Sequence, residues 1–583
     1  MGGILVDKPS RTVIVDGSIV YTDSSEILSS SGFEKLLLEY IEILRERNSP
    51  LLRALEAFRV GDEYHIRHIV EYIHLLTLRN VRDITTIINY VNPEDFAKFI
   101  ESFYTFWRNK HRFMIKRESY TLDPTRRTSI VFTATMVAEE FKNLIRNLYR
   151  TVMKNITVDD STVIVRQLPS GAQVTFLVDN LNVEKPKLTR FKSVPTIWGA
   201  IFDPPVIFYT RSNKRKGVLP VVDEPVLEKI KLEKSTGEWY HVPILVGDLL
   251  MYVYVHKEFL CHAAGLGNLF QFADIRSIEQ NEVCGVLIFG LMPEEIPDFK
   301  PAWKNGVIFN EGEFYVGIIP AIDENDYFGY MKKTILTLHN LYRIDQGKLP
   351  IHGSMARIVL KNGKSAVAMF VGDSGAGKSE TLDALNRLDE VAYVDVIIDD
   401  MGCLDIINGR VVAYGTETGA FVRLDDLPPG YAYYTMDRSI FMNPDKINAR
   451  VIVPFNNYKD IITPTPIDFF FYANNYTEVK EDSERIVFFS SVEEAIKVFS
   501  AGKRMSKGTT SEEGMTESYF ANPFGAVQRQ QVHHKIAEQF LTKMFETGVH
   551  VGEIRTMLGV EGYEKEGTQL AARALLKLIE KVK

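Results

Sequence analysis

The sequence has few cysteines, no long apolar run and no excess of basic residues. Its three cysteines, Cys261, Cys284 and Cys403, are far apart and fit no metal-binding spacing, so we expect buried thiols in a reducing cytosol. No apolar run approaches the roughly 18 residues of a membrane helix, and the N-terminal residues do not form a signal peptide. The net charge of −8 offers no basic surface to nucleic acid. We therefore expect a cytoplasmic protein that binds neither membranes nor nucleic acids.

A chain of 583 residues is too long for one hydrophobic core, so several domains are expected. Residues 12–22 predict a hairpin that turns at Asp16-Gly17. Apolar residues at helical spacing over 26–155 predict a mainly helical module. After residue 160 the pattern predicts strands, first as a hairpin of 163–167 with 174–178. Further strands are expected at Ile244–Val246, Met251–Val255, Val286–Met292 and Phe314–Ile319.

One stretch carries the strongest functional signal, a phosphate loop that fits G, four residues, then G-K-S/T. Its residues are Gly372, Asp373, Ser374, Gly375, Ala376, Gly377, Lys378, Ser379 and Glu380. An apolar run at Ala366–Val371 precedes it and a helical pattern follows, as this motif requires. Backbone N–H groups of such a loop bind phosphate, the lysine neutralises the terminal phosphates and the serine hydroxyl can bind Mg²⁺.

Two carboxylates, Asp399 and Asp400, directly follow the apolar run Val394–Ile398. Acidic residues at the end of a strand beside a phosphate loop commonly hold a divalent metal. We therefore predict a metal role for both residues. Farther along, Ser491 and Glu494 predict a capped helix start, and a second helix is expected over Gln530–Phe545. The stretch Lys503–Glu517 predicts a loop that serves as a lid.

Several segments share an order with one known family. They are Tyr209–Ser212, Tyr327–Lys333, Pro350–Ser354, Asp399-Asp400, Asn448–Val451 and Asn522–Gly525. In this order, around the phosphate loop, they resemble the phosphoenolpyruvate carboxykinases, most closely the ATP-dependent class. The resemblance is good over 327–583, thin over 200–326 and absent over 1–155. It implies interconversion of oxaloacetate with phosphoenolpyruvate and CO₂.

The resemblance also implies residue roles. Lys333, His352 and Asp400 would bind Mn²⁺, a set of amine, imidazole and carboxylate that suits this ion, and Asp399 and Ser379 would assist with metal. The positive charge of Lys332 would lower the pKa of Lys333. The remaining catalytic residues would be Arg211 on the substrate carboxylates, Tyr327 on the departing CO₂, and Lys378 and Arg450 on the transferring phosphoryl group.

The sequence departs from that family in ways that keep alternatives open. The loop sequence Gly-Asp-Ser-Gly-Ala-Gly-Lys-Ser-Glu is more similar to that of the HPr kinase/phosphorylases. This similarity favours, as a second hypothesis, a kinase that acts on a protein serine or on a small hydroxyl compound. In that case Asp399 or Asp400 would be the base. Near Glu512-Glu513, the family's nucleotide-side arginine is missing, so the donor is ATP by default, with GTP or pyrophosphate as alternatives. A non-catalytic scaffold is the third hypothesis.

We expect an α/β protein with mixed sheets and a phosphate-loop nucleotide domain, similar to phosphoenolpyruvate carboxykinase, plus an N-terminal helical module. The predicted domains are a helical accessory module at 1–155, a substrate domain at 156–350 and a nucleotide- and metal-binding domain at 351–583. No catalytic motif maps to 1–155, so this module is expected to serve solubility or assembly, for example as the contact of a homo-oligomer.

Overall fold

The computed structural model describes residues 3–5, 11–84, 91–117, 124–157, 169–180, 186–232, 238–373, 375–427, 431–506 and 514–581. The chain forms two compact units. Unit 1 comprises Met1–Glu184, Arg190–Phe208 and Lys234–Tyr240, and unit 2 comprises Lys185–Thr189, Tyr209–Glu233 and His241–Lys583. The range 1–155 lies wholly in unit 1, whereas 156–350 contributes to both units. The division into three domains remains a prediction.

Unit 1 is mainly helical, in agreement with the pattern over 26–155. Its helices are α1 (Ser24–Leu28), α2 (Ser31–Glu46), α3 (Ile66–Leu78), α4 (Val81–Ile84), α5 (Pro93–Asn109) and α6 (Pro124–Ile156), with a 3₁₀ helix at Pro50–Phe58. The side chains of Ser30 and Asn92 accept N–H groups at the starts of α2 and α5, and such caps satisfy backbone donors that the helix leaves free.

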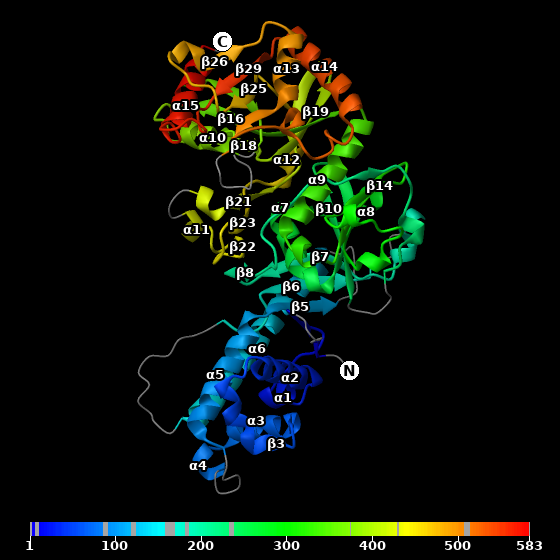
Figure 1. Cartoon of the computed structure of the whole chain (residues 1–583), viewed down its shortest axis with the longest axis vertical. Helices are drawn as coiled ribbons and strands as arrows, with labels where there is room; N and C mark the ends of the chain where they lie inside the picture. Colours follow the sequence, from blue (N-terminus) through cyan, green and yellow to red (C-terminus); the bar gives the residue numbers. More distant parts are fainter. Residues whose placement is uncertain are drawn as a thin grey trace. The chain divides into compact units, whose positions relative to one another are not determined.

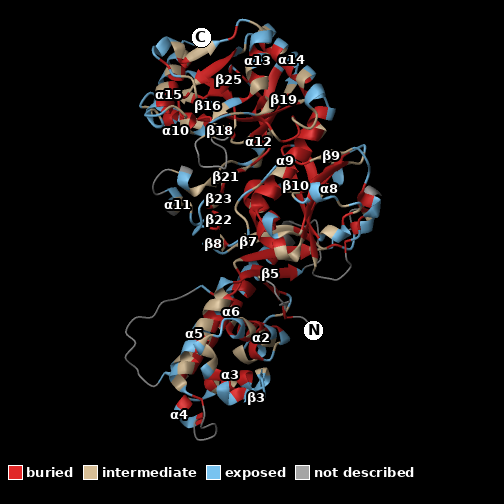
Figure 2. Cartoon of the chain, viewed as in Figure 1, coloured by how far each residue is buried: buried red, intermediate tan, exposed pale blue. Residues whose placement is uncertain are grey.

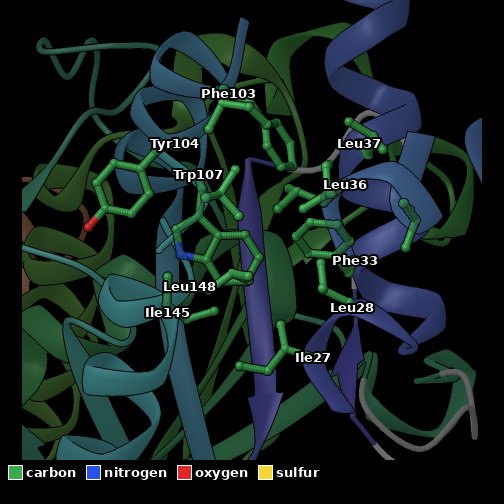
Figure 3. Close-up of a cluster of buried hydrophobic side chains, with 14 of the residues drawn as sticks. Ile27, Leu28, Phe33, Leu36, Leu37, Phe103, Tyr104, Trp107, Ile145 and Leu148 are labelled. Atoms are coloured by element: carbon green, nitrogen blue, oxygen red, sulfur yellow. The ribbon is translucent and has the colours of Figure 1, made fainter. Parts of the chain in front are cut away.

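The core of unit 1 combines aliphatic residues with many aromatic rings. Figure 3 shows Phe33, Leu36 and Leu37 facing Phe103 and Trp107, and the rings of Phe33 and Phe103 meet edge to face at 5.7 Å. These residues are all buried. The apolar faces predicted on the helices therefore cover one another within the described part of the unit, and their burial is the main source of its stability.

The strands of unit 1 form a sheet ordered β1 (Ile4–Leu5), β2 (Thr12–Asp16), β5 (His111–Arg117), β6 (Val174–Asp179) and β7 (Thr196–Phe202). Two short strands, β3 (Arg59–Val60) and β4 (Glu63–Tyr64), pair with each other outside this sheet. Residues Val206–Phe208 form a further short strand, β8. The predicted hairpin over 12–22 is wrong, because β2 pairs with β1 and, in parallel, with β5. The strand predicted at 174–178 is confirmed, but its expected hairpin partner, 163–167, lies outside the described residues.

Unit 2 contains a first sheet ordered β10 (Trp239–Val246), β11 (Leu249–His256), β13 (Val283–Leu291), β15 (Tyr315–Pro320), β14 (Val307–Asn310) and β9 (Val221–Val222), with β12 (Gln271–Phe272) beside β10. The four strands predicted between 244 and 319 are thereby confirmed. Helix α9 (Phe328–Asp345) packs on β13 and β15, and α7 (Leu260–Leu269) packs against α9. This packing fixes the helix that carries Lys332 and Lys333.

A second sheet in unit 2 is ordered β24 (Thr465–Pro466), β20 (Arg410–Gly415), β19 (Met401–Ile407), β16 (Leu349–Leu360), β17 (Ser365–Val371), β25 (Phe469–Asn474), β29 (His550–Arg555) and β26 (Ile486–Phe488). The long strand β16 pairs with β19 at its start and with β18 (Val391–Ile398) at its end. The turn between β18 and β19 holds Asp399 and Asp400, so β16 brings both beside its own residues.

Helices cover both faces of this second sheet (Figure 1). Alternate residues of β17 point to opposite cores: Ala368 and Phe370 pack toward α10 (Lys378–Asn386) and α15 (Glu566–Ile579). Val367 and Met369 pack toward α13 (Val492–Ala501) and α14 (Gln530–Thr547). The central strands are therefore buried on both sides, as Figure 2 shows. The mixed α/β architecture is confirmed.

The remaining strands of unit 2 flank the sites discussed below. β21 (Gly419–Arg423), β23 (Arg450–Pro454) and β22 (Ile440–Met442) form a small sheet. β27 (Lys503–Met505) and β28 (Met515–Glu517) form a ribbon at the ends of the predicted lid, of which 507–513 lie outside the described residues. The helix starts are as expected: Ser491 caps α13, and Glu494 accepts the N–H of Ser490.

Candidate functional site

The predicted phosphate loop connects a central strand to a helix. β17 ends at Val371 and α10 begins at Lys378, which confirms the expected order of strand, loop and helix. Gly375 and Gly377 have φ values of +80° and +91°, a left-handed region that favours glycine. The loop carbonyls of Gly375 and Ala376 accept hydrogen bonds from Asn475 (2.9 Å) and Thr556 (2.8 Å). Ser374 lies outside the described residues.

Lys378 is buried and its ammonium group turns back over the loop. It donates to the carbonyl oxygens of Gly372 (2.7 Å) and Asp373 (2.9 Å). Burial lowers the pKa of Lys378, although Asp400 and Asp373 oppose this shift. Asp373 also accepts from Arg504 at 3.0 Å. Ser379 is exposed and Glu380 half-buried at the first turn of α10, so the serine hydroxyl is available to a ligand.

Two of the predicted metal ligands, Lys333 and His352, contact a third, Asp400. Its Oδ1 lies 2.9 Å from Nε2 of His352, and its Oδ2 lies 2.9 Å from Nζ of Lys332 and also contacts Lys333. Glu417, which follows β20, lies 2.7 Å from Lys332. Residues from α9, β16 and the turn between β18 and β19 therefore meet at one carboxylate.

The backbone places this cluster beside the phosphate loop. The N–H of Gly353 donates to the carbonyl of Asp400 (3.0 Å), and the N–H of Gly372 donates to the carbonyl of His352 (3.2 Å). His352 is therefore held between the turn with the carboxylates and the first residue of the loop. The hydroxyl of Ser354 donates to the carbonyl of Asp399 at 2.7 Å, which fixes the same turn.

The hydrogen bonds of His352 favour metal binding by its other nitrogen. Nδ1 faces the carbonyl oxygen of Ala521, which can only accept, so Nδ1 carries a proton. Nε2 lies 2.9 Å from Oδ1 of Asp400, and a metal ion bound by both atoms would replace this direct contact. Phe520 and Ala521 both have positive φ values, +53° and +49°. Such backbone conformations are costly outside glycine and cluster at functional sites.

Burial and neighbouring charges shift the pKa values of Lys332 and Lys333 in opposite directions. Burial opposes the charge of Lys332, but the carboxylates of Asp400 and Glu417 outweigh it and raise its pKa. Burial lowers the pKa of Lys333, and the charge of Lys332 adds to the shift. Burial also opposes the ionisation of Asp400, yet the two lysines hold its pKa well below the usual range. Lys332 therefore stays an ammonium ion, and Lys333 is the lysine that more readily becomes a neutral ligand.

Glu417 was not predicted from the sequence. It is buried, and burial raises its pKa to about 7. The only local signal is the polar run Thr416-Glu417-Thr418 between two strands, which is also typical of an ordinary turn. Burial likewise raises the pKa of Asp399, and the neighbouring charge of Asp400 adds to it.

The predicted catalytic residues Tyr327 and Arg450 lie near Lys332 around one ring. The ring of Phe421 is 5.8 Å from that of Tyr327, 5.4 Å from the guanidinium of Arg450 and 6.0 Å from Nζ of Lys332. Burial raises the pKa of Tyr327, while Arg450 opposes the shift. The structure therefore brings Tyr327, Lys332 and Arg450 together, although they are up to 123 residues apart in the chain.

Arg211, which was predicted to bind the substrate carboxylates, forms ion pairs with carboxylates of the chain. Its side chain forms ion pairs with Asp323 (3.2 Å) and, more loosely, Asp326 (3.9 Å). Its backbone N–H also donates to Asp326 at 2.9 Å. Its role on the substrate carboxylates stays a prediction.

A second group with metal-binding side chains is Cys261, His262 and Asp326, all buried. Its geometry is that of a hydrogen-bonded chain: Nε2 of His262 donates to Asp326 at 3.0 Å, and Cys261 lies 3.7 Å from Nδ1. The second oxygen of Asp326 accepts from Arg211. Because the carboxylate already has partners on both oxygens, this group fits a structural role better than a metal site.

No model of a known protein family matches this chain, and no curated protein gives a significant match. The function is therefore argued from the site itself. None of the helices in the described part of the chain combines the length and the apolar character that crossing a bilayer requires.

Proposed function

We propose that the chain is a metal-dependent carboxykinase that interconverts oxaloacetate and a phosphoryl donor with phosphoenolpyruvate and CO₂. The observation that carries the proposal is the convergence of Lys333, His352 and Asp400 beside the phosphate loop. A kinase that uses only nucleotide-bound Mg²⁺ has no need of such a set. An amine, an imidazole and a carboxylate together suit Mn²⁺, and the bond from Nδ1 of His352 to a carbonyl is the usual support of a metal-binding histidine.

Lys333, His352 and Asp400 would hold Mn²⁺, which when bound would stabilise the negative charge of the enolate left by loss of CO₂. Lys332 and Glu417 position Asp400 through the ion pairs they form. Tyr327, buried beside Arg450, would orient the leaving carboxyl group. The partial burial of these side chains would limit the access of water, which could otherwise protonate the enolate.

Phosphoryl transfer would use the loop and the small sheet. Lys378, held over the loop carbonyls, would exchange those bonds for oxygens of the donor. Ser379, exposed at the start of α10, would bind Mg²⁺ with Asp399 nearby. Arg450 would neutralise charge on the phosphoryl group as it passes to the enolate oxygen. ATP is the donor we propose, with GTP and pyrophosphate as alternatives.

The test is a panel assay of phosphoenolpyruvate formation from oxaloacetate with Mn²⁺ and, in turn, ATP, GTP or pyrophosphate. Phosphorus NMR identifies the product directly. One donor should give phosphoenolpyruvate, and Asp400→Asn should abolish its formation. Absence of product with all three donors would refute the proposal.

A kinase of a serine or small hydroxyl compound is the second candidate, favoured by Asp399. This carboxyl lies beside the loop with a pKa raised by burial, as a proton acceptor requires. The same panel, with a serine peptide in place of oxaloacetate, distinguishes the two, because only a kinase would produce phosphoserine. Assembly of a homo-oligomer through residues 1–155 and a cytoplasmic location also remain proposals.

A further inference from the structure

Three arginine side chains of unit 1, on different elements, lie beside its aromatic core. Arg108 is in the last turn of α5, Arg112 is in β5 and Arg146 is in α6. Arg112 is only 5% exposed, whereas Arg108 and Arg146 are half-buried. We call these three residues the arginine cluster.

Tyr104 and Arg108 are close neighbours of Arg112. The guanidinium of Arg108 lies 6.0 Å from the ring centre of Tyr104. Burial lowers the pKa of Arg112 to about 10, which Tyr104 and Asp203 oppose and the positive charge of Arg108 enhances. Two guanidinium groups, from α5 and β5, therefore meet beside one tyrosine.

The neighbours of Arg146 on α6 reach the same surroundings. Lys142, one turn before it, pairs with Asp203 at 2.7 Å. Tyr149, one turn after it, stacks on the ring of Tyr104 at 4.0 Å. Side chains three and four positions apart share one face of a helix, so Arg146 lies on the face of α6 that is turned toward the other two arginines.

The guanidinium groups of the arginine cluster keep unused donors inside the protein. Nε of Arg108, Nε and Nη1 of Arg112 and Nε of Arg146 are buried without a hydrogen-bond partner among the described residues. The hydroxyl oxygen of Tyr104 is buried in the same way, and Figure 3 shows it directed away from the apolar cluster. The part of the chain that the structure describes thus leaves several polar groups of one region unsatisfied.

The carboxylates of this region have other partners. Asp203 pairs with Lys142, and Glu101 accepts a hydrogen bond from the hydroxyl of Tyr149. Within the described residues, no carboxylate forms an ion pair with the arginine cluster. A buried charge is costly unless it is paired and hydrogen-bonded. An anion that binds from solution would supply the missing partner.

We propose that the arginine cluster binds the phosphate group of a small molecule, at a site within unit 1 that is distinct from the phosphate loop of unit 2. A phosphate monoester carries a charge of roughly −1.5 to −2 and three acceptor oxygens. It can therefore accept from several guanidinium groups, whose planar forks bind its oxygens in pairs. The hydroxyl of Tyr104 adds a further donor. Arg108 and Arg146 are half-buried, so a soluble anion can reach them. This inference does not depend on the proposed carboxykinase function.

Isothermal titration calorimetry with inorganic pyrophosphate, in metal-free buffer, tests the site in the full chain. Every protein of the series carries Lys378→Ala, which weakens binding at the phosphate loop. Arg112→Gln should weaken pyrophosphate binding by roughly 10- to 100-fold, as loss of charge-assisted hydrogen bonds does. Its melting temperature without ligand should be equal or higher, because a buried unpaired charge is removed. Arg67→Gln, an exposed change on α3, is the matched control and should alter neither value.

Equal pyrophosphate affinity in Arg112→Gln and its parent would overturn the inference, and so would absence of binding by the parent. An equally large loss in Arg67→Gln would show unspecific charge attraction and would also overturn it. If Arg112→Gln does not fold, Arg146→Gln decides by the same criteria.

A lipid headgroup could supply the same phosphate chemistry, and co-sedimentation with phosphatidylglycerol vesicles distinguishes the two sources. Pyrophosphate binding without sedimentation of the parent assigns the site to a soluble ligand. Sedimentation that is lost in Arg112→Gln assigns it to a lipid phosphate.

Discussion

Asp326 connects helix α7 to the loop that carries Arg211, and its loss should be measurable at one of the two. One oxygen accepts from His262 at 3.0 Å and the other from the backbone N–H of Arg211 at 2.9 Å. In Asp326→Asn the amide offers one acceptor and one donor group. One of the two donors, His262 or Arg211, must then face the NH₂ group. The substitution should therefore loosen either α7 or the loop that carries Arg211.

The magnitude follows from the pKa of Asp326. Burial opposes its ionisation, but the bond from His262 outweighs this and lowers the pKa from 3.8 to about 2. A depressed carboxyl pKa stabilises the folded state above the unfolded pKa, and this stability is lost as the pH falls through the folded value. The difference is worth about 2 kcal/mol near pH 7. This stabilisation of the folded state should persist down to pH 4 and fall to roughly half by pH 3.

Hydrogen–deuterium exchange is the assay, since it reports local opening in a chain of two units. At pH 7 either the amide of Arg211 or the amides of α7 should exchange roughly 30-fold faster in Asp326→Asn, because about 2 kcal/mol corresponds to a factor of that size. The control is Asp323→Asn, which removes an exposed partner of Arg211 and should change exchange less than about 3-fold. Equal protection in Asp326→Asn and wild type would refute the reasoning. A difference in melting temperature that stays constant down to pH 3 would show that packing, and not charge, is responsible.

Three further changes test other parts of the account. Lys378→Ala should lower phosphoryl transfer by about 100-fold or more with little change in far-UV circular dichroism, and retention of a tenth of the rate would refute the phosphate-loop assignment. Gly377→Ala should abolish nucleotide binding in calorimetry, because a Cβ there would lie 2.6 Å from Thr556, whereas Gly363→Ala, with a similar φ but open space, should not. Deletion of 1–155 should give aggregates in size-exclusion chromatography, because β6 would lose its neighbour β5. A monodisperse truncated protein would contradict this.

The sequence predicted those parts of the fold that depend on local pattern. The strand–loop–helix around Gly372 and the helices of unit 1 follow from glycine chemistry and helical spacing. The predicted hairpin over 12–22 was wrong because β2 pairs with β5, about 100 residues away. An alternating apolar pattern indicates a strand but not the strand with which it pairs. Such distant parallel pairing is set by the packing of the helices between the strands.

The candidate site likewise contains contacts between distant parts of the chain that the sequence did not predict. Lys333, His352 and Asp400 were found through their order in the chain, whereas Glu417 reaches the site only through tertiary contacts. The short motif that singled out Arg211 likewise gave no sign of its ion pair with Asp323. The residues next to a charged side chain in the sequence do not reveal which groups form ion pairs with it in the fold.

The central claim is that a transition metal binds at His352, Lys333 and Asp400, apart from any metal on the nucleotide. Titration of Mn²⁺ followed by electron paramagnetic resonance, with Mg²⁺–ATP saturating, tests it directly on wild type and His352→Ala. The account predicts Mn²⁺ binding weakened by at least 10- to 100-fold, a loss that even an outer partner of a metal ligand can cause. Binding of Mg²⁺–ATP at Lys378 and Ser379 should be unchanged. Equal Mn²⁺ affinity in the two proteins would contradict the account.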